Sequence, residues 1–202
     1  MIVLNHFKTL LAKYGLDEFI ERLHEVEAII WGSAAVHCFL EKPSWEPADL
    51  DILVDTEEQA AKLSSSLEAA GYDSGIKTTV RDVGLFGYED NIRSAFAETI
   101  DSVVVHQQWR NGIVRMLPIE TLGRIRRVVK IYIGRPAQAL AVADLDICQS
   151  HIEFDQHGGV NLYNTIKGPA AKLLPSLFDL SMDDMRRIEK WKARDFIISG
   201  FE

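Results

Sequence analysis

Hydrophobic and polar positions along the chain predict helices near both ends and strands between them. Apolar residues recur at helical spacing over 3–26, which predicts one amphipathic helix or two helices separated near Gly15. Residues 28–31 then predict a short buried strand. A tight turn at Gly32 and Ser33 follows, and a helix from about 34 to 40 comes after it.

The alternation in the segment ADLDILVD, residues 48–55, predicts a strand. Successive side chains of a strand point to opposite faces, so Asp49, Asp51 and Leu53 share one face, and Leu50, Ile52 and Val54 share the other. A helix is predicted directly after this strand. Thr56 is its expected N-cap and Gly71 marks its end.

The second half of the chain is less regular. Residues 76–81 and 99–107 are rich in β-branched side chains and predict strands. Residues 117–134 predict a helix with Pro118 in its first turn. Residues 144–163 predict strands on either side of a turn at 157–159, and residues 181–196 predict a closing helix capped by Ser181.

Composition narrows the class of protein without identifying it. With 47% hydrophobic and 26% charged residues, the chain of 202 residues is expected to form one domain over 1–202. The net charge of −8 argues against a protein that coats nucleic acid non-specifically. Without a signal-peptide core or a long apolar run, the chain is expected to be cytoplasmic and not membrane-bound. Cys38 and Cys148 are expected to be buried free thiols.

The pentapeptide ADLDI occurs twice, at 48–52 and at 143–147, and either copy is a candidate metal site. The first copy follows a strand–turn–helix at IIWGS, where the unpaired first amides of the helix can receive a phosphate. Asp101 opens a later predicted strand, and Glu98 is close enough to compete with it. Carboxylates and substrate phosphates are the ligands that Mg²⁺ prefers. An ordinary solvated strand face is the alternative interpretation of the first copy.

IIWGS, DLDI and IDSV, in this order, resemble the nucleotidyltransferase superfamily of the polymerase-β type, over roughly residues 28–106. The resemblance implies a mixed α+β (α/β) fold with a central sheet flanked by helices, and a mixed, partly helical C-terminal extension over about 117–202. It also implies that Asp49 and Asp51 bind two Mg²⁺ ions, or Mn²⁺ in their place. By the same resemblance, Asp101 is the third carboxylate, and Gly32 and Ser33 hold the phosphates of a nucleoside triphosphate such as ATP.

The function expected from this resemblance is metal-dependent transfer of a nucleoside monophosphate to an acceptor hydroxyl. A small molecule, an RNA end and a protein side chain all remain open as acceptors. The chain departs from many relatives in the loop after the turn, where Lys42 is the only basic residue. The alternative is a catalytically inactive binding or interaction module with the same fold.

The second ADLDI copy has no such turn before it. Asp144 and Asp146 are therefore expected to lie on an acidic strand that pairs with basic helices, and a zinc site with Cys148 is not favoured. Arg124, Arg127 and Lys130 would share one face of the predicted helix over 117–134, either as a solvated surface or as a surface for polyanions.

Three further positions have open interpretations. Trp191 and the cations around it either pack against the protein or bind single-stranded nucleic acid. His37 is expected to be a partly buried packing residue, and His106 is the better candidate for proton handling near Asp101.

Overall fold

A computed structural model describes residues 2–72, 113–118, 128–133, 145–173 and 182–199 of the chain. The predicted strands over 76–81 and 99–107, with Asp101, Glu98 and His106, lie outside the described residues. The helices are α1 (Ile2–Lys13), α2 (Phe19–Glu25), α3 (Gly32–Phe39), α4 (Glu57–Ala69), the 3₁₀ helix η1 (Asp146–Gln149) and α7 (Met182–Lys192). The strands are β1 (Ile29–Trp31), β2 (Asp49–Val54), β3 (Ile113–Pro118), β4 (Val128–Ile133), β5 (His151–Phe154), β6 (Val160–Tyr163), β7 (Ala170–Lys172) and β8 (Ile197–Ser199).

Six strands form one mixed central sheet in the order β3-β4-β2-β1-β5-β6. β2 is parallel to β4 and antiparallel to β1, and the remaining neighbours are antiparallel. β7 and β8 form a separate parallel pair. With helices around a mixed sheet, the predicted mixed α+β class is confirmed.

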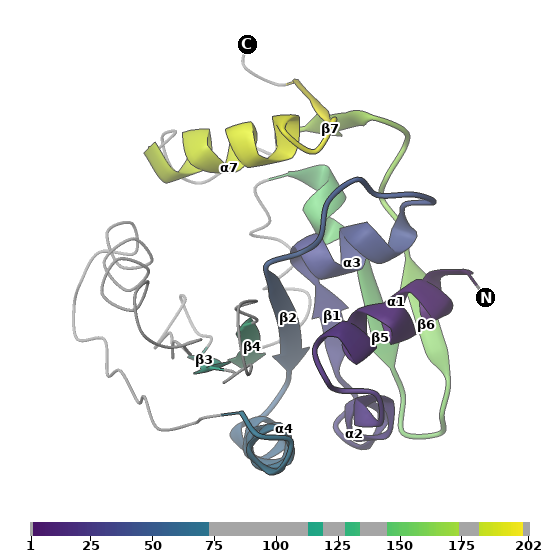
Figure 1. Cartoon of the computed structure of the whole chain (residues 1–202), viewed down its shortest axis with the longest axis vertical. Coiled ribbons are helices and arrows are strands. Elements are labelled where there is room, and N and C mark those ends of the chain that lie inside the picture. Colours follow the sequence, from purple (N-terminus) through teal and green to yellow (C-terminus); the bar gives the residue numbers. More distant parts are fainter. Residues whose placement is uncertain (1, 73–112, 119–127, 134–144, 174–181, 200–202) are drawn as a thin grey trace.

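The main core lies between the sheet and the helices that cover it (Figure 1). Leu50, Ile52 and Val54 of β2 belong to this core, as predicted from their alternation with the acidic positions. A second cluster joins α3 to the C-terminal elements through Val36, Leu145, Ile147, Cys148, Ala171, Trp191 and Phe196. Trp191 is only 4% exposed, so its packing interpretation is confirmed.

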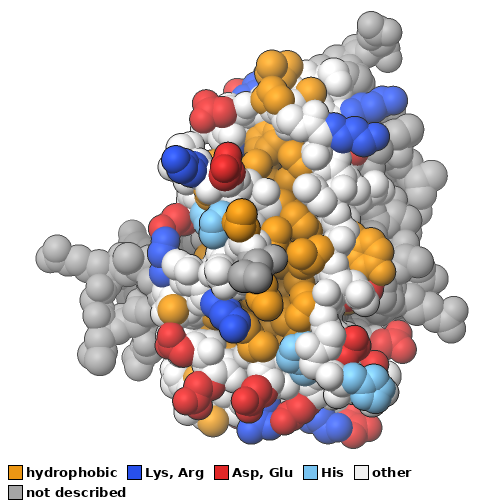
Figure 2. Space-filling model, turned by 90° about the vertical axis from the view of Figure 1, so that its right-hand side faces the viewer, with side chains coloured by type: hydrophobic (Ala, Val, Ile, Leu, Met, Phe, Trp, Pro, Cys, Tyr) orange, Lys and Arg blue, Asp and Glu red, His pale blue; other side chains and the backbone are white. Residues whose placement is uncertain are grey.

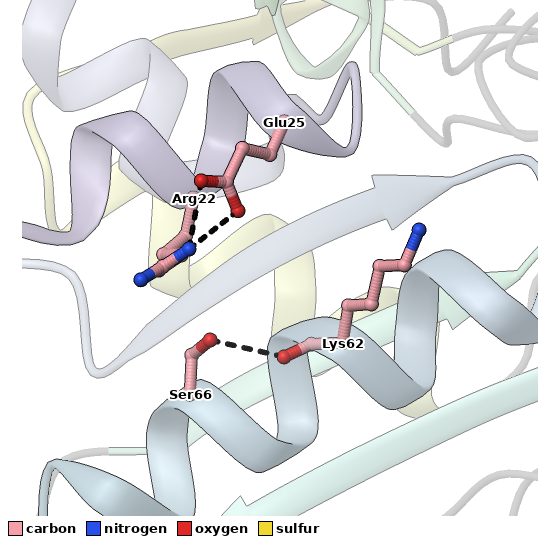
Figure 3. Close-up of polar contacts among 4 residues, drawn as sticks. All are labelled: Arg22, Glu25, Lys62 and Ser66. Atoms are coloured by element: carbon pink, nitrogen blue, oxygen red, sulfur yellow. Dashed lines mark hydrogen bonds and ion pairs between the residues drawn. The ribbon is translucent and has the colours of Figure 1, made fainter.

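Local helix signals explain most element boundaries in the N-terminal part. The apolar pattern over 3–26 forms two helices, and Gly15 lies between them with a φ of +68°. Thr56 caps α4 in a capping box, because its side chain accepts from the Gln59 amide while the Gln59 side chain accepts from the Thr56 amide. Arg22 pairs with Glu25 on α2, and Ser66 donates to the Lys62 carbonyl on α4 (Figure 3). These last contacts are exposed and stabilise the fold only slightly.

The helix predicted over 117–134 is wrong where the structure describes it. Residues up to Pro118 belong to β3, and Val128–Ile133 form β4. Pro118 is the last residue of an edge strand, where its missing amide donor is tolerated. Lys130 therefore does not share a helix face with Arg124 and Arg127, which lie outside the described residues.

The second ADLDI copy is not an acidic strand over its described residues, so that prediction is also wrong. Asp146 opens η1, where its Oδ1 accepts hydrogen bonds from the amides of Ile147 and Lys172. The Asp146 carboxylate therefore links the start of η1 to the backbone of β7. The strands predicted around 157–159 are confirmed as the β5–β6 hairpin.

Hydrophobic side chains gather in a band on the face that carries β6 and the start of α1 (Figure 2). Leu162 and Tyr163 of β6 are large side chains that are 43% and 45% exposed. No helix within the described residues is both long enough and apolar enough to cross a membrane. Cys38 and Cys148 are both free and buried, as predicted.

Candidate functional site

Asp49 and Asp51 lie on β2, a central strand of the sheet, and both side chains are buried. Their residues are 7% and 9% exposed, so the alternative of a solvated strand face is wrong. Burying two acidic side chains on one strand is expensive unless other groups compensate the charge. The surrounding residues therefore decide what this pair can do.

The turn at Gly32 and Ser33 lies directly against the carboxylate pair. Gly32 has a φ of +64°, and a Cβ atom placed on it would be 2.6 Å from Oδ2 of Asp51. Ser33 Oγ donates to Oδ1 of Asp49 over 3.4 Å. The side chain of the N-cap residue Trp31 makes no capping hydrogen bond within the described part of the chain, so it does not take up the first amides of α3. The structure thus brings four predicted site residues together, while Asp101 lies outside the described residues.

Two further residues belong to this group: Lys130, which the sequence analysis placed on a helix face, and Tyr132, which it did not single out. Lys130 Nζ lies 2.6 Å from Oδ2 of Asp49, and both side chains are about nine-tenths buried. The Tyr132 hydroxyl donates to Oδ1 of Asp51 over 3.1 Å. Both come from β4, whose parallel register places Lys130 beside Asp51. The site is therefore a buried arrangement of two carboxyls with a lysine and a phenol.

The segment VVKIYI contained a signal that could have located both residues. Val129, Ile131 and Ile133 are buried, and the polar residues between them point to the other face of the sheet. This period of two is typical of a strand, and β-branched residues dominate the segment. Arg124 and Arg127 precede this segment, and with Lys130 they have the three-residue spacing of a helix face. That spacing led to the wrong prediction of a helix over 117–134.

Burial raises the pKa of Asp51 to about 7, and the nearby negative charge of Asp49 adds to this effect. The Lys130 ammonium and the hydrogen bond from Tyr132 act in the opposite direction. Asp51 is therefore partly protonated at neutral pH, whereas Asp49 has a direct cationic partner.

The donor types at this site fit a hard divalent cation such as Mg²⁺, which binds carboxylate oxygens. Asp49 and Asp51 would hold it, and the absence of a Cβ on Gly32 leaves room beside Oδ2 of Asp51. Lys130 pairs with Oδ2 of Asp49, so metal binding requires the ammonium to shift or to share that oxygen. Within the described residues no group of three or more His, Cys, Asp or Glu side chains is arranged around one point.

Aromatic residues line the surroundings of the site. Trp31, which ends β1 opposite Asp51, packs edge-on against Tyr132, and its buried Nε1 has no hydrogen-bond partner among the residues that the structure describes. His37 packs edge-on against Trp45, and burial lowers its pKa. The packing interpretation of His37 is therefore confirmed.

No family model matches the chain, and no curated protein matches it. Among solved structures, it is similar to the Thermotoga maritima CCA-adding enzyme in a complex with tRNA. The identity is 15% and the TM-score is 0.51, over 96% of this chain and 42% of that enzyme. The chain thus spans less than half the length of its structural neighbour. The chain accordingly has a nucleotidyltransferase-like fold: a central mixed sheet flanked by helices.

Proposed function

We propose that the chain transfers a nucleoside monophosphate from a nucleoside triphosphate to an acceptor hydroxyl, with Mg²⁺ or Mn²⁺ as cofactor. One observation carries the proposal, in addition to the fold. The Gly32–Ser33 turn at the start of α3 lies in contact with the carboxyls of Asp49 and Asp51. A phosphate-receiving turn and a carboxylate pair are thereby held within a single small site.

The chain's own residues have distinct tasks in this reaction. The amides at the start of α3 and the Ser33 hydroxyl bind phosphate oxygens, and the positive end of the helix dipole favours their charge. Asp49 and Asp51 would hold the metal ions. When bound, these ions lower the pKa of the acceptor hydroxyl and neutralise charge on the leaving group. The acceptor oxygen forms a bond to the α-phosphorus, its proton passes to Asp101, the proposed third carboxylate, and the bond to pyrophosphate breaks.

The buried ion pair between Asp49 and Lys130 favours a second candidate function. A lysine only 2.6 Å from Oδ2 of Asp49 compensates the charge that a metal ion would otherwise compensate. A chain that binds nucleotide through the same turn but does not turn it over is consistent with this pair. The two candidates differ in whether a metal replaces or joins Lys130.

Label transfer from α-³²P nucleoside triphosphates tests the first candidate. The purified chain is incubated with each nucleotide, Mg²⁺ or Mn²⁺, and acceptors of three kinds: small hydroxyl compounds, RNAs including tRNA, and proteins. We expect labelled product and pyrophosphate from the wild type and neither from Asp51→Asn. Asn is close in shape to a protonated Asp, and Asp51 already holds its proton in part, so this variant is expected to fold.

Asp55→Asn is the matched control, because Asp55 follows the same strand but is exposed. Retained turnover in Asp51→Asn would place the reaction elsewhere. Calorimetric binding of nucleotide without any labelled product would instead support the binding module. A wild-type chain that binds neither nucleotide nor metal would contradict both candidates.

A further inference from the structure

The chain around the C-terminal end of α7 forms a second cationic feature close to the carboxylate pair. The guanidinium carbon of Arg194 lies 3.9 Å from the ring centre of Trp45 and 4.8 Å from that of Trp191. The two indoles pack edge-on against each other, and Phe196 packs edge-on against Trp191. Contacts between a guanidinium and aromatic rings at these distances hold the guanidinium in place. They leave the N–H groups at its edge available for hydrogen bonds.

Arg194 lacks an acceptor that its burial would normally require. Its NH1 atom is buried and has no hydrogen-bond partner within the described part of the chain. Burial lowers the pKa of Arg194, and the charge of Asp49 raises it, so the guanidinium lies within the field of the carboxylate site. An unsatisfied buried donor of this kind is costly, and a bound acceptor would remove the cost.

Lys190 lies four residues before Arg194 and near both carboxyls. Desolvation lowers its pKa, while the charges of Asp49 and Asp51 raise it. By surface area the Lys190 side chain is exposed. Its ammonium is therefore reachable from solvent and screened by it. Figure 1 shows α7 above the end of the sheet where β1 ends and β2 begins.

Among the described residues, the charges near the carboxyl pair sum to a positive value, in a protein whose net charge is −8. Three cations, Lys130, Lys190 and Arg194, interact with the two carboxyls of Asp49 and Asp51. Two buried donors, Trp31 Nε1 and Arg194 NH1, also have no hydrogen-bond partner among the described residues. A ligand with several negative oxygens complements this arrangement better than a neutral sugar or base.

We propose that Lys190 and Arg194 bind the polyphosphate chain of the nucleoside triphosphate. This inference rests on the proposed function, because it concerns the same substrate. It makes the C-terminal helix part of the nucleotide site. We expect the affinity for a nucleotide to depend more on how many phosphates it carries than on which base it carries.

Calorimetry with inorganic tripolyphosphate and with nucleoside triphosphates tests the proposal, each in Mg²⁺ and in EDTA. We expect Lys190→Gln and Arg194→Gln each to weaken binding of both probes by about ten- to a hundredfold, as expected for a lost hydrogen bond to a charged group. Lys192→Gln is the matched control, because Lys192 is exposed on the same helix and pairs with Glu189. Its affinity for both probes should equal that of the wild type.

Arg194→Lys separates folding from binding. This variant keeps the positive charge but loses the planar group that contacts the two indoles. Its circular dichroism spectrum reports whether α7 is still folded. A folded Arg194→Lys variant that binds tripolyphosphate more weakly than the wild type supports the proposal. Unchanged tripolyphosphate binding in both Lys190→Gln and Arg194→Gln would overturn it, as would a wild type that does not bind tripolyphosphate.

The outcomes also separate this proposal from the proposed function. Variant-sensitive binding of tripolyphosphate without any nucleotidyl transfer would support the α7 site and contradict the enzyme. Transfer with a KM for nucleotide that neither variant changes would support the enzyme and contradict the α7 site.

Discussion

Replacing Gly32 by Ala tests the geometry on which the candidate site depends. Gly32 has a φ of +64°, and an added Cβ would lie 2.6 Å from Oδ2 of Asp51. The added methyl group therefore lowers the free energy of unfolding in two separate ways. One arises from the backbone conformation and the other from the contact with the carboxylate.

The two costs can be estimated separately. A left-handed backbone costs a non-glycine residue about 1–2 kcal/mol. Forcing an extra methyl group into a packed site costs typically about 1–3 kcal/mol. Gly32→Ala should therefore lower the free energy of unfolding by roughly 2–5 kcal/mol, the sum of the two. In a domain of this size each kcal/mol corresponds to about 2–4 °C in Tm.

Gly15→Ala isolates the backbone cost, because Gly15 has a φ of +68° and no atom within 4 Å of an added Cβ. Urea unfolding followed by circular dichroism gives the free energy of unfolding for the wild type and both variants. We expect Gly32→Ala to be less stable than Gly15→Ala by about 1–3 kcal/mol. Combining Gly32→Ala with Asp51→Ala should remove this excess, because the clashing carboxylate is then absent.

Equal destabilisation by Gly32→Ala and Gly15→Ala would refute the reasoning. The turn and the carboxylate would then not be in contact, and the proposed phosphate and metal site would lose its geometric basis.

Three other perturbations test the electrostatics and local structure. Lys130→Met leaves Asp49 buried without its cation and should cost about 3–5 kcal/mol in urea unfolding; the double variant Lys130→Met with Asp49→Leu should recover part of that loss, and no recovery would contradict a buried pair. The raised pKa of Asp51 means that the folded state keeps a proton which the unfolded state releases above about pH 4. The stabilisation that comes from this raised pKa is therefore complete below about pH 4 and is lost as the pH rises to about 7. Asp51→Asn should flatten the stability profile over this range in EDTA, and an unchanged slope would contradict the shift. Thr56→Ala removes the N-cap of α4 and should cost about 1 kcal/mol by the same unfolding assay, whereas a change near zero would argue against the capping box.

Lys130 shows why the candidate site was only partly predictable. Its ion pair with Asp49 depends on the parallel register between β2 and β4, which are separated by a long stretch of chain. Nothing near Lys130 in the sequence specifies that register. The arginines before Lys130 have a helical spacing, and Pro118 and Gly134 stand where a helix over 117–134 would begin and end. The local pattern therefore favoured a helix over the observed strands.

The sequence by itself determined the features that depend on residues close together in the chain. Alternation over 49–54 placed both carboxyls on one strand face, and Thr56 marked the start of α4, as observed. These signals are local because strand alternation and helix capping act within a few residues. Only the tertiary structure decided that the Gly32 turn touches Asp51 and that Lys130 compensates Asp49. Such contacts depend on how distant strands and helices pack together, and residue spacing does not encode that packing.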